Sequence, residues 1–203
     1  MKLAAVVFAA GLIVMGKPAM GKPARSSAET AQSVIVCMDR PAEPTLVYRA
    51  QLEASKILAR VSVPIEWSSG RACRERNIIH IRLSIQTPQS LMPGALAFCS
   101  PGSSKDIQVL YDRVRATVAP DMQAHLLAYV LAHELTHMIE GVTRHSEAGV
   151  MKAHWTAEDY VAMSTGGLAF AAEDVRLVEQ GMALRLGNRE AGSGKNIRAI
   201  VDP

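Results

Sequence analysis

Four of the six histidines in this chain lie within one short stretch, AHELTHMIEGVTRHSEAGVMKAHW, which runs from Ala132 to Trp155. The first two, His133 and His137, form the pattern HExxH with Glu134 between them. Residues four apart on a helix point the same way, so both imidazoles could occupy two corners of a zinc tetrahedron. Glu134 projects near them without being a ligand, where it can hold a water molecule and take its proton. The pattern therefore predicts metal-assisted hydrolysis.

A catalytic zinc ion normally has three protein ligands and keeps a fourth position for water, so HExxH needs a third ligand. The residue types leave three candidates open. They are His145, His154 and an acid in the last helix, of which Glu173 is the best placed. His80 and His125 lie farther away in the sequence, and we interpret both as structural.

The HExxH residues need a helix to bring them together, and the surrounding sequence predicts one. The segment PDMQAHLLAYVLAHELTHMIEG begins at Pro120, has Asp121 in the first turn where the helix dipole favours an acid, and reaches Gly141, where a helix commonly ends. Its leucines, valine and methionine make it apolar enough to be buried. We expect a buried helix over residues 120–141.

The other apolar runs predict an α+β domain with one twisted sheet, because a strand, a helix, three or four strands and then the long helix follow one another along the chain. TAEDYVAMST starts at Thr156 with Asp159 three residues on, which resembles a capping box, and Gly166 and Gly167 end it. Strands are expected at 33–38, 63–67, 77–85 and 107–114, with a short apolar segment at 95–98, and further helices at 44–60, 156–165 and 170–186.

The start of the chain is typical of a targeting segment. The uncharged run from Leu3 to Gly16 would span only about 21 Å as a helix, against about 30 Å for a hydrocarbon core, so residues 1–28 are predicted to be a signal peptide with an uncertain cleavage site. Removing them lowers the formal net charge from +3 to −1, since they carry four basic residues and no acidic one. Nothing in the remaining charge favours nucleic-acid binding.

The chain has three cysteines, too few for a disulfide scaffold but enough for one bridge in an exported protein. Cys73 lies in the polar stretch SSGRACRERN and Cys99 lies beside a turn in FCSPGSS, whereas Cys37 lies in the apolar run SVIVCM. We therefore expect a bridge between Cys73 and Cys99, with Cys37 as a buried thiol. The alternative is three unpaired cysteines.

The stretch HELTHMIEGVTRHSEAGVMKAHW resembles the zinc-binding stretch of the metzincin metallopeptidases, and HSEAGVMKAHW is similar to the matrix metalloproteinase pattern. It also resembles a group of uncharacterised exported bacterial proteins with HExxH and a later HS. The resemblance implies a helix ending at Gly141, a turn that brings His145 back as third ligand, and Met151 as a hydrophobic floor in a Met-turn. In this chain the Gly and the later His lie four and eight residues after His137, where metzincins usually have three and six.

With this resemblance, His145 becomes the favoured third ligand. His154 is then better explained as a packing or surface residue. A Glu173 ligand would instead resemble a gluzincin, although other helix acids are equally simple guesses. These other acids are Glu158, Asp159 and Glu179.

The resemblance also implies a fold and an activity. The fold would be zincin-like and α+β, with a twisted mixed sheet of four to five strands, a backing helix, a buried active-site helix and a small helical C-terminal part. We assign residues 29–187 to this domain and 188–203 to a polar tail. The segment GALAF could be the edge strand that pairs with extended substrate, or a short edge strand with no binding role.

We therefore expect an exported, periplasmic or secreted zinc metallopeptidase. It would bind peptide or protein substrates, and no nucleic acid, and would have no stable membrane anchor after processing. An alternative from another class is a zinc-stabilised binding or scaffold domain without useful proteolysis, and a third is an exported domain with no metal. Glu134 favours the enzyme, because a purely structural zinc site needs no carboxylate beside its histidines.

Overall fold

The computed structural model describes residues 33–38, 43–74, 78–101 and 105–198. All of these residues belong to one folded unit, Ala31–Pro203. The expected signal peptide, residues 1–28, lies outside the described residues. None of the helices in the described ranges has both the length and the apolar character that crossing a bilayer requires.

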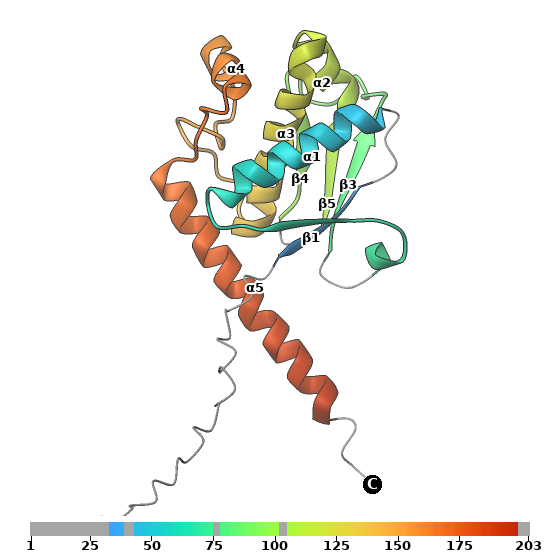
Figure 1. The fold of residues 1–203 in the computed structure, drawn as a ribbon, viewed down its shortest axis with the longest axis vertical. Coiled ribbons are helices and arrows are strands. Elements are labelled where there is room, and N and C mark those ends of the chain that lie inside the picture. Colours follow the sequence, from blue (N-terminus) through green and yellow to red (C-terminus); the bar gives the residue numbers. More distant parts are fainter. Residues whose placement is uncertain (1–32, 39–42, 75–77, 102–104, 199–203) are drawn as a thin grey trace, which may run out of the picture. The chain divides into compact units, whose positions relative to one another are not determined.

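The unit contains a mixed sheet of five strands (Figure 1). Its strands are β1 (Val34–Met38), β2 (Ile65–Ser68), β3 (Ile79–Ser84), β4 (Ala97–Cys99) and β5 (Asp106–Leu110). Their order across the sheet is β2-β1-β3-β5-β4. All neighbouring pairs are parallel except β4 and β5, so β4 is an antiparallel strand at one edge. The predicted α+β class with a single sheet is confirmed.

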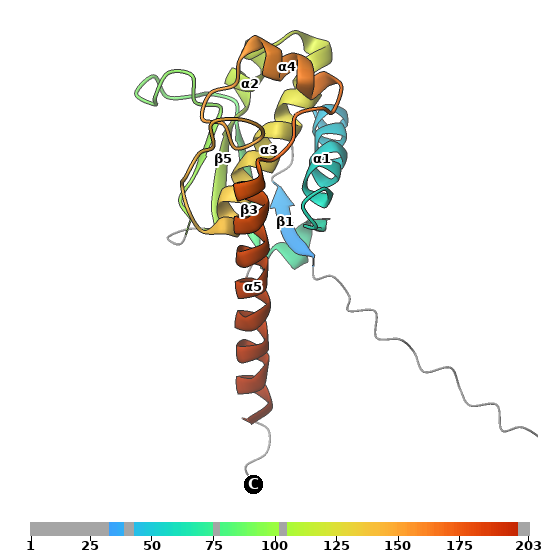
Figure 2. The ribbon, with the colours of Figure 1, turned by 90° about the vertical axis from the view of Figure 1, so that its left-hand side faces the viewer.

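Two helices, α1 (Pro44–Ala59) and α3 (Gln123–Glu140), pack against each other and against the sheet (Figures 1 and 2). Every residue of α3 except His125 and Glu140 is buried. A 3-10 turn (η2, Pro120–Met122) precedes α3, and Gly141 ends it with a φ of 73°, a left-handed conformation that glycine adopts without strain. The predicted buried helix and its glycine stop are confirmed.

Two of the predicted elements differ from the structure. The expected strand over 107–114 ends at Leu110, and helix α2 (Tyr111–Thr117) follows directly. Tyr111 and Val114 are both buried and lie three residues apart, so the apolar residues there fit a helix as well as a strand. Helix α5 (Ala172–Arg198) continues well beyond the expected end at residue 186.

The short helix α4 (Ala157–Ser164) begins as predicted. Thr156 and Asp159 form a complete capping box, in which each side chain accepts a hydrogen bond from the other residue's backbone N–H. Gly166, with a φ of 68°, follows the end of the helix. This turn leads the chain toward α5.

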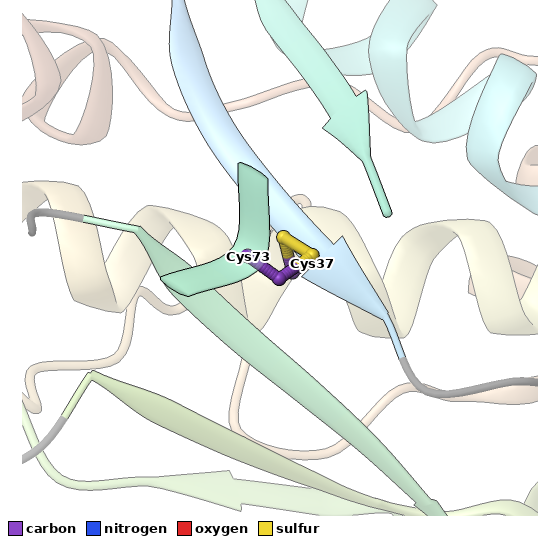
Figure 3. The surroundings of a disulfide bond; sticks show 2 residues. All are labelled: Cys37 and Cys73. Carbon is purple, nitrogen blue, oxygen red and sulfur yellow. A yellow bond between two sulfur atoms is a disulfide. The ribbon is translucent and has the colours of Figure 1, made fainter. Parts of the chain in front are cut away.

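The disulfide joins Cys37 to Cys73, and Cys99 is a free thiol, so the expected Cys73 to Cys99 bridge is wrong (Figure 3). Cys37 lies on β1 and pairs in register with Ser68 on β2. The 3-10 helix η1 (Gly70–Arg74) follows β2 directly and carries Cys73 back to β1. Cys99 lies on β4, which β3 and β5 separate from β1, so the sheet order excludes the predicted pair.

Candidate metal centre

Helix α3 and the loop after it bring three of the predicted site residues together. His133 and His137 lie one turn apart, and their Nε2 atoms are 3.0 Å from each other. His145 returns from the loop that follows Gly141, with its Nε2 atom 3.4 Å from that of His137. One ligand atom from each of the three imidazoles lies within 4.8 Å of the other two.

Backbone carbonyls fix the orientation of the two helix imidazoles. Nδ1 of His133 lies 2.9 Å from the carbonyl oxygen of Val150, and Nδ1 of His137 lies 3.0 Å from that of Val142. A carbonyl oxygen can only accept, so each Nδ1 carries the proton and donates it, which leaves Nε2 with a free lone pair. Burial lowers the pKa of both imidazoles to about 4. Neutral rings with free Nε2 atoms are the form that binds metal.

The spacing of these nitrogen atoms fits a zinc ion. Tetrahedral zinc with nitrogen ligands at 2.0 to 2.1 Å would place neighbouring ligand atoms about 3.3 Å apart. The observed separations from Nε2 of His137, 3.0 and 3.4 Å, lie close to this value. A donor set of three imidazoles also suits zinc better than magnesium or calcium, which prefer oxygen. The residues present therefore fit zinc.

Glu134 lies beside the imidazoles and faces the same cleft as His133 and His145. Its side chain is only 7% exposed, and burial raises the pKa of its carboxyl group to about 7. A hydrogen bond from the Cys99 thiol lowers that pKa in part. Cys99 also contacts the backbone oxygen of Glu134 at 3.9 Å, so β4 packs directly on the HExxH turn.

A cleft of about 450 Å³ opens in front of these residues. Its apolar wall includes Leu96 beside the edge strand, Val130 from α3 and Trp155 from the loop before α4. Trp155 also packs edge-on against the ring of His133, with 5.6 Å between ring centroids. Lys152 lines the cleft as well, and its ammonium group is bound to a carboxylate of α4 at 2.6 Å. The cleft is thus mainly apolar around its histidines and Glu134.

The other candidates for the third ligand do not join the group of three imidazoles. The side chain of Glu173 is 51% exposed and binds Arg176 within α5. His154 is exposed and lines the cleft, but its nitrogen atoms do not join the three-histidine group of the described residues. His125 contacts Glu53 of α1 at 2.9 Å, which agrees with a structural role.

Met151 is buried, with 1% of its surface exposed. Its carbonyl oxygen accepts a hydrogen bond of 2.8 Å from the backbone N–H of Ser146, so the turn that carries Met151 is tied to the residue after His145. The preceding residue, Val150, supplies the carbonyl that orients His133. The segment that carries Met151 is therefore hydrogen-bonded to His133 and to Ser146, the residue after His145.

Sequence reasoning missed Asp174, the neighbour of Glu173. Its side chain is fully buried, with 0% exposed, and it binds Arg144 and Ser146 on either side of His145. The only signal in the sequence is an acid in the first turn of a helix, which is too common to single out one residue.

Comparisons of the chain with family models, with curated proteins and with solved structures find no match.

Proposed function

We propose that this protein is an exported zinc-dependent metallopeptidase that hydrolyses peptide bonds, with a zincin-like fold and a metzincin-like site. The observation that carries the proposal is the convergence of His133, His137 and His145 beside Glu134 in an open cleft. A structural zinc site is closed by four protein ligands, whereas this group has three and adjoins a cleft. That arrangement favours catalysis over the alternative of a zinc-stabilised scaffold.

In this proposal the three imidazoles hold the metal through Nε2. The bound zinc would supply Lewis acidity, polarising the peptide carbonyl and making water a stronger acid. Glu134 would accept the proton of the attacking water and pass it to the leaving amine. The buried Met151 would form the hydrophobic floor of the site, as the resemblance to metzincins implies.

The surrounding elements support a peptide substrate. Among the described strands, β4 has only β5 as a neighbour, and Ala97 on β4 lines the cleft. An extended peptide could therefore add to the free side of β4 through backbone hydrogen bonds. Export is supported by the apolar N-terminal run and is compatible with the Cys37–Cys73 disulfide, since such bonds persist in oxidising compartments.

The test is hydrolysis of casein or of a peptide library by the zinc-loaded protein. Glu134→Gln should abolish cleavage while zinc binding is retained, because an amide cannot accept the proton of water. Glu179→Gln, which changes an exposed carboxylate on α5, is the matched control and should cleave like the wild type. A Glu134→Gln variant that cleaves at the wild-type rate contradicts the role of this residue. A zinc-loaded wild type that cleaves no substrate in the library favours the scaffold instead.

A further inference from the structure

His145 is held differently from the other two histidines. The rings of His133 and His137 are each anchored by a backbone carbonyl at Nδ1. Within the described residues we find no such carbonyl bound to Nδ1 of His145, whose ring stacks on His133 at 5.3 Å and meets His137 edge-on at 5.0 Å. Its side chain is also exposed, and it lies in a loop instead of a helix. Its position therefore depends on the backbone on either side of it as well as on these two ring contacts.

One buried carboxylate holds both neighbours of His145. Oδ1 of Asp174 accepts a hydrogen bond of 2.6 Å from Nη2 of Arg144 and one of 2.5 Å from Oγ of Ser146. Its other oxygen, Oδ2, accepts a 3.0 Å hydrogen bond from the backbone N–H of Ala171. One oxygen of Asp174 thus binds the backbone just before α5, and the other binds the loop that carries His145.

Helix α5 is itself anchored to the end of α3, the helix that carries the other two histidines. A Cβ atom at Gly181 would lie 2.0 Å from the carbonyl oxygen of Ile139, so the two backbones are in direct contact there. One turn later, Nη2 of Arg185 donates a 2.9 Å hydrogen bond to the carbonyl oxygen of Met138. These contacts link the position of Asp174 to the position of α3.

We propose that Asp174 is the positioning residue for the third metal ligand: through Arg144 and Ser146, it holds His145 against the two histidines of α3. The inference rests on the proposed metal site but not on peptide cleavage. It predicts that a substitution of Asp174 changes metal affinity and coordination geometry, although Asp174 contacts neither the three imidazole rings nor the cleft. Residues hydrogen-bonded directly to metal ligands typically contribute about 10-fold to 100-fold in metal affinity, and we expect an effect of this order from Asp174, which acts through the two neighbours of His145.

The experiment is titration of the metal-free full chain with cobalt(II), whose visible absorption reports coordination geometry, together with zinc competition against a chelator. Asp174→Asn should bind about 10-fold to 100-fold more weakly than the wild type and show an altered cobalt spectrum. Glu173→Gln makes the same carboxylate-to-amide change one residue away, at an exposed side chain that is hydrogen-bonded to Arg176, and should match the wild type in both measurements.

Ser146→Ala provides a second variant in case loss of the buried charge prevents folding. It removes one of the two contacts beside His145 and leaves the Arg144 pair, so its affinity should fall by a smaller factor, about 3-fold to 10-fold. A folded Asp174→Asn or Ser146→Ala protein with wild-type affinity and spectrum overturns the inference. A wild type that binds no cobalt or zinc overturns it together with the proposed function. Weakened binding in these variants supports it even if the wild type cleaves no peptide.

Discussion

Gly181 lies where the backbone of α5 contacts that of α3, and its replacement by alanine should weaken that contact. The added Cβ would fall 2.0 Å from the carbonyl oxygen and 2.7 Å from the carbonyl carbon of Ile139, both backbone atoms that cannot rotate away. Overpacking of this kind costs up to about 3 kcal/mol. The gain from replacing a helical glycine by alanine offsets about 1 kcal/mol of that cost. We expect Gly181→Ala to lower the free energy of unfolding by about 2 kcal/mol.

Gly187 in the same helix provides the matched control, because nothing lies within 4 Å of a Cβ placed there. Gly187→Ala should therefore show only the helix-propensity gain, about 0.5 to 1 kcal/mol. In thermal unfolding followed by circular dichroism, Gly181→Ala should lower Tm by about 4 to 8 °C and Gly187→Ala should raise it by about 1 to 4 °C. Equal stability of the two variants would refute the close packing of α5 on α3.

Two further predictions concern stability. Burial, and next the charge of Asp174, raise the pKa of Glu140 to about 7, with Arg144 opposing them. The charged carboxylate therefore lowers the free energy of unfolding as pH rises from about 4.5 to 7. In urea titrations, Glu140→Gln should be more stable than the wild type at pH 8, by up to about 1 kcal/mol after solvent screening. At pH 4 it should be no more stable than the wild type. Reduction of the Cys37–Cys73 bond, which closes a sequence separation of 36, should lower the free energy of unfolding by about 4 kcal/mol in the same assay, and an unchanged urea midpoint would contradict this role.

The sequence correctly predicted the helices whose ends and buried faces depend on residues close together in the chain. The apolar spacing and the glycine stop at Gly141 predicted α3, and the pair Thr156 and Asp159 predicted the start of α4. HExxH placed two imidazoles on one helix face because four residues make about one turn. The loop that returns His145 to these two was expected only from the resemblance, since spacing alone left Glu173 and His154 open.

Other features depend on how distant parts of the chain pack together. The disulfide partner of Cys73 is decided by the strand order, which places β1 beside β2 and separates Cys99 on β4 from β1 by two strands. The end of β5 at Leu110 is decided by burial of Tyr111 on a helix face. Asp174 is distinguished from Glu173 only by the direction its side chain takes from α5, and one residue along a helix turns that direction by about 100°.

The central claim is that His133, His137 and His145 bind one zinc ion, and the most direct test is the zinc content of the purified protein and of His145→Ala. We expect about one zinc per wild-type chain, because three neutral imidazoles suit that metal. The variant should lose it during dialysis, since removal of one of three ligands leaves a weak site. A wild-type protein that is free of metal and takes up no added zinc contradicts the account. So does a His145→Ala protein that keeps its zinc while Glu173→Ala loses it.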